Sequence, residues 1–176
     1  TPSRKNTQIR KSIEAVTRAT LSMSRLKHGA LIVLEHNTGL ENYIETGVRL
    51  DALTPPDLLR TIFASGTTLH DGAVIIRDDK IAAASVILPL GQATNATKQL
   101  LGTRHLAALG ITEMSDAVVV VVSEETGVIS IAHNGQLIRG LDQQGLEQML
   151  QAFYAAQNGI PAWRRLYRVI LRRLGL

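Results

Sequence analysis

Apolar residues recur every three or four positions in residues 7–27, which is the period of an amphipathic helix. The apolar positions are Ile9, Ile13, Val16, Met23 and Leu26, and Thr20 fills the one missing step. We expect this helix to stop at Gly29, since glycine is common just past a helix C-terminus.

Three further helices follow from the same period. One begins after Thr54, the expected N-cap, with proline in its first turn and apolar Leu58, Leu59, Ile62 and Phe63. Another is marked by Leu146, Met149, Leu150, Phe153 and Tyr154, and a last one spans residues 163–174.

Runs of β-branched and other apolar residues predict the strands. Residues 30–34 and the five valines at 118–122 are continuous, as strands buried on both faces are. Residues 73–76 and 81–88 form a hairpin pattern, and Asn134-Gly135 is a strong hairpin signal that joins strands at 128–132 and 136–139. We expect residues 35–53 to be loop with a brief strand at its centre, and 89–99 to be a surface loop.

This order of elements predicts an α/β (α+β) fold, with a mixed central β-sheet surrounded by helices. We expect one domain at residues 28–158, an N-terminal linking helix at 1–27 and a basic C-terminal helix at 159–176.

The composition indicates a folded domain and excludes several classes of site. Hydrophobic residues make up 45% and charged residues 19%, which is typical of a folded domain, and cysteine is absent, so no disulfide or thiolate metal site can form. Aromatic residues reach only 3%, too few for a surface that stacks on single-stranded bases.

The net charge of +4 comes from the five arginines after residue 160; the remainder has 14 basic and 15 acidic residues. We therefore expect no nucleic-acid partner.

The first candidate for chemistry is the loop before the strand at 73–76. A carboxylate held there, Asp71, could bind a divalent cation or accept a proton from a hydroxyl, and Gly72 lets a phosphate or sugar approach the backbone. His70 could be a second ligand. The alternative is an ordinary Asp-Gly turn.

Two other segments suit the same chemistry. Gly102 and Thr103 begin a helix whose free N–H groups favour anions, with Thr103 as the expected cap and Arg104 suited to phosphate oxygens. The turn at 123–127 places Glu124 and Glu125 at a strand end, where acids often contact metals or ligands. A capped helix and a solvated turn are the alternatives. Together, the three segments supply what phosphoryl or nucleotidyl transfer needs.

At these residues the chain closely resembles the diadenylate cyclase (DAC) family. Five blocks match in order: residues 29–33, 68–76, 87–90, 101–105 and 123–127. The resemblance implies a metal-dependent enzyme that condenses two ATP into cyclic di-AMP, a bacterial second messenger, and releases two pyrophosphates. It implies one ATP per protomer and a face-to-face homodimer.

The resemblance also assigns roles to residues. Asp71 would bind the metal (Mn²⁺, Mg²⁺ or Co²⁺) and activate the 3′-hydroxyl, with His70 and Glu124 as further metal ligands. The remaining ATP-binding residues would be Gly72, Ala73, Leu88, Gly102, Thr103, Arg104, His105, Ser123, Glu124 and Glu125.

Two positions depart from the family pattern. Leu106 stands where the family's Arg-His-Arg signature has its second arginine, and Ile87 stands where some relatives carry an aromatic residue. The alternative hypothesis is therefore a weak or inactive domain that senses ATP or cyclic di-AMP.

The N-terminal helix resembles the membrane-linked branch of the family. We accordingly expect a cytoplasmic domain of a protein that is anchored through an upstream segment. The basic C-terminal helix would rest on anionic lipid, dock on a regulator, or pack on its own domain with its arginines in solvent.

Overall fold

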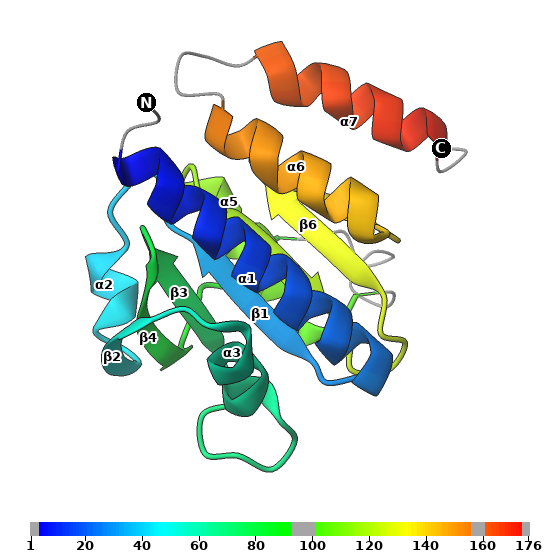
Figure 1. Cartoon of the computed structure of the whole chain (residues 1–176). Helices are drawn as coiled ribbons and strands as arrows, with labels where there is room; N and C mark the ends of the chain where they lie inside the picture. Colours follow the sequence, from blue (N-terminus) through cyan, green and yellow to red (C-terminus); the bar gives the residue numbers. More distant parts are fainter. Residues whose placement is uncertain (1–3, 93–100, 156–160, 174–176) are drawn as a thin grey trace.

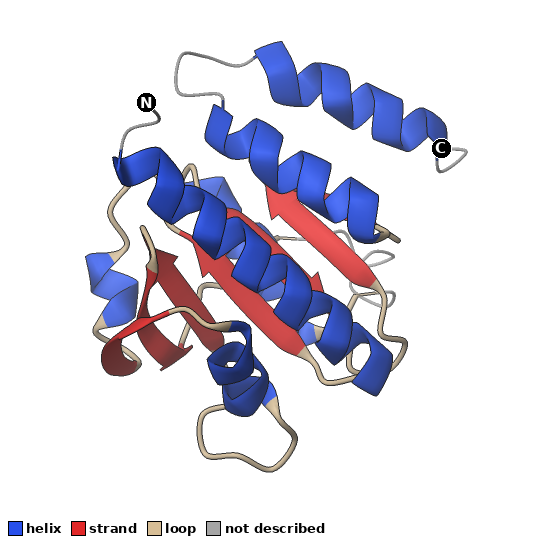
Figure 2. Cartoon of the chain, in the orientation of Figure 1, coloured by secondary structure: helices blue, strands red, loops and turns tan. Residues whose placement is uncertain are grey.

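A computed structural model describes residues 4–92, 101–155 and 161–173. Figure 2 shows the alternation of helices and strands. The elements are α1 (Arg4–Leu26), β1 (Ala30–Leu34), α2 (Glu41–Ile44), β2 (Val48–Leu53), α3 (Pro56–Phe63), β3 (Ala73–Arg77), β4 (Lys80–Val86), α5 (Thr103–Met114), β5 (Val118–Val122), β6 (Ile129–His133), β7 (Gln136–Arg139), α6 (Gln143–Ala155) and α7 (Pro161–Arg173).

The strands form one seven-stranded sheet in the order β2-β4-β3-β1-β5-β6-β7. β1 pairs with β3 in parallel, and the other neighbouring pairs are antiparallel. The predicted mixed sheet surrounded by helices is therefore confirmed.

Helices cover both faces of this sheet (Figure 1). α1, α3, α6 and α7 contribute to the core on one face, and α2 and α5 to the core on the other. β1 and β5 lie at the centre, and their alternate residues enter the two cores. Burial on both faces is the reason that these two strands are continuously apolar.

The N-terminal helix ends at Leu26, one residue before the predicted limit, but Gly29 is not the residue that stops it. Lys27, not Gly29, adopts the left-handed conformation (φ 52°), and the N–H of His28 donates to the carbonyl of Met23 at 2.9 Å. This pair of features is a Schellman stop, so the expected stop at Gly29 is wrong. Leu26, placed on the apolar face by its spacing, is 61% exposed, whereas Thr20 is buried as predicted.

Two other local predictions are wrong. Residues 35–53 contain the short helix α2 and end in strand β2, so the strand is not central. Thr54 does not cap α3, whose N-cap is Pro55; the Thr54 hydroxyl instead donates to the carbonyl of Asp79 at 2.8 Å. Tertiary contacts explain both differences, because β2 pairs with β4 and Thr54 binds the turn that precedes β4.

The remaining elements follow the prediction closely. The turn at Asn134 (φ 52°) and Gly135 (φ 72°) joins β6 to β7 as expected of a type I′ hairpin. Within the expected loop at 89–99, residues 93–99 lie outside the described part of the chain. The domain limits at residues 28 and 158 stay predictions.

The C-terminal helix packs on its own domain. Ile170 of α7 is buried in the core that α6 shares, and Arg173 donates to Gln144 at 3.1 Å. None of the described helices is long and apolar enough to cross a bilayer.

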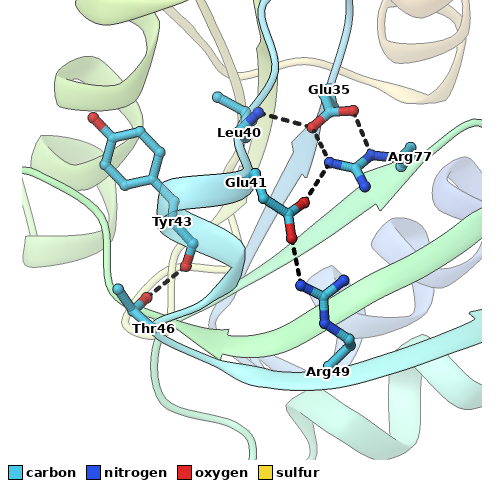
Figure 3. Close-up of polar contacts among 7 residues, drawn as sticks. All are labelled: Glu35, Leu40, Glu41, Tyr43, Thr46, Arg49 and Arg77. Atoms are coloured by element: carbon cyan, nitrogen blue, oxygen red, sulfur yellow. Dashed lines mark hydrogen bonds and ion pairs between the residues drawn. The ribbon is translucent and has the colours of Figure 1, made fainter.

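A charged network ties the short α2 and the edge strand β2 to the centre of the sheet (Figure 3). Arg77, at the end of β3, donates to both oxygens of Glu35 (2.7 and 3.0 Å) and to Glu41 (3.1 Å). Glu41 also pairs with Arg49 of β2, and the N–H of Leu40 donates to Glu35. The hydrogen bonds to Glu35 raise the pKa of Arg77, so this guanidinium stays charged.

We predict that Arg77→Met lowers the free energy of unfolding by about 2 kcal/mol, because it leaves the Glu35 carboxylate, whose side chain is 9% exposed, with one hydrogen bond instead of three. Urea denaturation followed by circular dichroism measures the loss. The matched control is Arg49→Met at the exposed end of the network, which should cost much less. Equal losses for the two variants would contradict the central role of the Glu35–Arg77 pair.

Candidate functional site

The register of the central strands brings the predicted segments to one edge of the sheet. Ala30, the first residue of β1, pairs with Val122, the last residue of β5. The β1–β3 register, with Ile32 beside Val74, places Gly72 beside Ala30. The loop before β3, the end of β4 and the turn after β5 therefore meet where β1 begins.

The loop before β3 is built around a glycine that no other residue can replace without strain. Gly72 has φ 84°, and a Cβ there would lie 2.7 Å from the carbonyl oxygen of Val86. The hydroxyl of Ser85 donates to the carbonyl of Asp71 at 2.9 Å and fixes the loop on β4. The backbone is thus held, while the Asp71 side chain is 86% exposed.

His70 is oriented so that one ring nitrogen is available. Its Nδ1 lies 2.6 Å from the carbonyl oxygen of Thr67, which can only accept, so Nδ1 carries the hydrogen. Nε2 then lies 3.4 Å from Oδ1 of Asp71. An unprotonated imidazole nitrogen beside a carboxylate oxygen is a pair of ligand atoms that fits a divalent cation.

The third predicted metal ligand has another partner. Glu124 accepts a hydrogen bond from Nη1 of Arg104 at 3.0 Å. Across the described ranges, no group of three or more His, Asp or Glu side chains is arranged to hold a metal ion. His70 and Asp71 are therefore the two predicted ligands that could share a cation, and Glu124 would have to leave Arg104 to join them.

Helix α5 presents its N-terminus to the same edge. Its N-cap is Gly102, without a side-chain hydrogen bond, and Thr103 is the first helical residue. The expectation that Thr103 caps the helix is therefore wrong. The N–H groups of the first turn stay available to an anion, which a helix N-terminus favours.

Arg104 connects α5 to the start of β1. A Cβ at Gly29 would lie 2.5 Å from Cζ and Nη1 of Arg104, so the guanidinium lies directly on the backbone of Gly29. The same Nη1 also forms the ion pair with Glu124 at 3.0 Å. Arg104 is thus fixed between the start of β1 and the turn after β5.

His105 is buried next to this arginine. It is 5% exposed, and neither ring nitrogen has a hydrogen-bond partner among the described residues. Burial lowers the pKa of His105, and the charges of Arg139 and Arg104 lower it further, so the ring is neutral at pH 7. A neutral imidazole can still donate one hydrogen bond to an anion.

The turn at 123–127 is locked to the N-terminal helix. The N–H of Gly127 (φ 74°) donates to the carbonyl of Ser123, and the Ser24 hydroxyl of α1 donates to the carbonyl of Gly127 at 2.6 Å. Ser123 is half-buried and Glu125 is exposed. Helix α1 therefore helps to position the turn that carries the two acids.

The segment after β4 presents Ile87 instead of Leu88. Leu88 is 8% exposed and lies in the core beside α5, whereas Ile87 is 69% exposed. Ala73 is also buried in that core. The predicted contacts of Leu88 and Ala73 with a nucleotide stay predictions.

Two residues of this edge were missed from the sequence. The sequence pattern indicates only a helix stop at Gly29. Its place in the family block at residues 29–33 was the signal that could have identified it as part of the site. Arg139 ends β7 opposite Ser130 and lies two residues after Leu137, which packs in the core beside α5. It therefore shares the sheet face of His105, and only the register shows this.

Comparisons with known proteins identify a family and relatives of this chain. Residues 17–137 match the DAC family, described as DisA bacterial checkpoint controller nucleotide-binding. The chain is 46% identical over 157 residues to cyclic di-AMP synthase CdaA of Bacillus subtilis, covering 89% of this chain and 57% of that protein. It is 46% identical over 138 residues to a diadenylate cyclase of Listeria monocytogenes, covering 78% and 50%.

Solved structures are similar as well. DacA from Staphylococcus aureus, as a double mutant, superposes with a TM-score of 0.79 at 46% identity, covering 82% of this chain and 96% of that one. A structure titled as a hypothetical membrane spanning protein from Bacillus cereus gives 0.71 at 47% identity, covering 74% and 64%. The chain spans about half the length of the curated relatives it matches.

We predict that Gly29→Ala weakens the binding of ATP, the ligand implied by the resemblance, by about tenfold while leaving the fold intact. The new methyl group would displace the guanidinium of Arg104, a flexible side chain, and a hydrogen bond from a charged group contributes about 1.5–3 kcal/mol. Calorimetric titration and thermal unfolding measure the two effects.

The contrasting variant is Gly110→Ala. Its Cβ would collide with the backbone carbonyl of Pro89, which cannot move away as a side chain can, so this variant should lose stability instead. A Gly29→Ala protein that binds ATP as tightly as the parent would show that Arg104 does not need its present position.

Proposed function

This chain belongs to the DAC family, and on that premise we propose that it is the catalytic domain of a diadenylate cyclase, condensing two ATP into cyclic di-AMP with release of two pyrophosphates. The observation that carries the proposal is the meeting of three segments at one sheet edge: the loop with the exposed Asp71 carboxylate, the open N-terminus of α5 with Arg104, and the turn whose Glu124 pairs with Arg104. The printed names of the relatives support the same reaction.

The chemistry assigns distinct tasks to these groups. In each half-reaction the 3′-hydroxyl of one ATP attacks the α-phosphorus of the other. A P–O bond to that phosphorus forms, the bond to the β-phosphate oxygen breaks, and pyrophosphate leaves. Asp71 accepts the hydroxyl proton, while Arg104, His105 and the N–H groups of the α5 first turn bind the negatively charged phosphates. Thr103 and Ser123 would add hydroxyl contacts.

A homodimer follows from the product. Cyclic di-AMP contains two nucleotides joined twice, so two bound ATP must face each other, and a chain that binds one ATP needs a second copy. The exposure of Asp71 supports this arrangement, because its carboxylate contacts the neighbouring His70 but is 86% exposed and open to a nucleotide held by the facing chain.

A divalent cation belongs to the proposal. Mn²⁺, Mg²⁺ or Co²⁺ would be held by His70 Nε2 and Asp71, and when bound it would neutralise charge on the phosphates. We also propose that the domain is cytoplasmic and joined to a membrane through a segment outside these 176 residues. The similar Bacillus cereus protein, described as a hypothetical membrane spanning protein, supports that attachment.

We predict that the chain incubated with ATP and each of the three cations yields cyclic di-AMP detectable by mass spectrometry. Asp71→Asn should lower the rate by roughly 10²–10⁴-fold, because it removes the proton acceptor, while thermal stability stays near that of the parent. Absence of product with every cation, from protein shown to dimerise, would overturn the proposal.

A second candidate function is a sensor that binds ATP or cyclic di-AMP with little turnover. Leu106 favours it, because the residue is half-buried in the first turn of α5 and brings no cation to a position where the family pattern has arginine. Its carbonyl accepts a hydrogen bond from the N–H of Gly91, which any side chain at this position would preserve.

Leu106→Arg separates the two candidates. If the family arginine contacts phosphate, the variant should raise kcat/KM by about tenfold, equivalent to about 1.4 kcal/mol. Steady-state kinetics with ATP measure the change, and Leu106→Gln, without the charge, is the matched control. An equal effect of both substitutions would show that charge at this position does not limit the reaction.

A further inference from the structure

Positive charge is concentrated on two helices of the same sheet face. Residues 4–26 of α1 contain six basic residues and one acidic residue, and residues 161–173 of α7 contain five basic residues and no acid. The rest of the chain has eight basic and fourteen acidic residues. The two helices thus carry a formal charge of +10 and the remainder −6.

The fold places this charge on one side of the molecule. α1, α6 and α7 lie side by side in Figure 1, and all three belong to the core on the same face of the sheet. α2 and α5 cover the opposite face, and they contain two acidic residues and one basic residue. We call the outer surface of α1 and α7 the basic face. Its exposed cations are Arg4, Arg10, Lys11, Arg18, Arg25, Arg168, Arg172 and Arg173.

Folding of the domain does not account for these cations. None of the eight forms an ion pair with a described carboxylate. Arg168 and Arg172 are spaced i,i+4, where like charges destabilise a helix. The apolar side of α7 already packs on α6 through Ile170. The arginines are therefore an outward-facing surface whose mutual repulsion an anionic partner would relieve.

We propose that the basic face docks on the surface of an anionic lipid bilayer. The cations are spread over two helices separated by α6, which suits a broad, flat charged surface better than a groove-shaped contact. Exposed apolar residues lie among them, Val169 at 55% and Leu26 at 61%, and these suit the lipid headgroup region. The phosphate backbone of a nucleic acid would provide no apolar contact for these two side chains.

Docking in this way leaves the candidate site open. The site lies at the sheet edge where β1 begins, and Arg104 and His105 come from α5 on the opposite face. Because the apolar side of α7 is occupied, attachment is electrostatic and reversible, without insertion of a helix.

Flotation of the full 176-residue chain with vesicles tests the proposal. The chain should bind vesicles containing phosphatidylglycerol and not those of phosphatidylcholine alone. Binding should be present at about 0.1 M salt and lost at about 1 M, since the Debye length falls from ~10 to ~3 Å. Arg168→Gln with Arg172→Gln, and separately Lys11→Gln with Arg18→Gln, should each reduce the partition coefficient by about 30-fold, since each cation contributes about 1 kcal/mol.

The matched control removes the same charge elsewhere, with Arg49→Gln and Arg139→Gln, and should change partitioning less than either double variant. Thermal unfolding of all three variants verifies that they fold. Failure of the parent chain to bind anionic vesicles, or an equal loss in the control, would overturn the proposal. Tighter binding to duplex DNA than to anionic vesicles would also overturn it, in favour of a nucleic-acid surface.

Discussion

The pairing of β1 with both β3 and β5 is the constraint on which the site depends. Parallel pairing on one side and antiparallel pairing on the other bring the starts of β1 and β3 to the same edge as the end of β5. Three loops far apart in the sequence, at residues 70–72, 102–105 and 123–127, are thereby gathered around the backbone of Gly29. A one-residue slip in either pairing would turn buried residues of both cores toward the wrong face and separate these loops.

Much of the site is built from close backbone contacts. Gly72 lets the loop before β3 lie against β4, and Gly110 lets α5 approach Pro89. Gly29 leaves room for the guanidinium of Arg104 against its backbone. At each of these glycines, atoms of another element occupy the space that a side chain would fill. The main chain itself therefore holds the loops in place. The groups that we propose for the reaction, Asp71 above all, can then stay exposed without losing their position. Such preorganisation is what phosphate chemistry requires, since most of its catalysis is positioning and charge neutralisation.

Charge is divided among three places with different roles. The Glu35–Arg77 pair with Glu41 stabilises the sheet at the edge away from the site, and its members satisfy one another. At the site, Arg104 and Glu124 balance each other while Asp71 stays available. On the basic face, the cations have no described acidic partner. The first arrangement stabilises the fold, the second suits the proposed phosphate ligand, and the third fits the proposed partner outside the chain.

Periodicity in the sequence was sufficient for β1, β5, the β6–β7 hairpin and most of α1, because buried strands, type I′ turns and amphipathic helices leave local patterns. The family blocks likewise located Asp71, Arg104 and Glu124 without any structure. Only the tertiary structure decided that Thr54 binds a distant turn and that Arg104 lies between Gly29 and Glu124. These outcomes depend on contacts between residues far apart in the chain, which a local pattern cannot encode. The same holds for the basic face, whose two helices lie at opposite ends of the sequence and share one side of the molecule because both contribute to the same core.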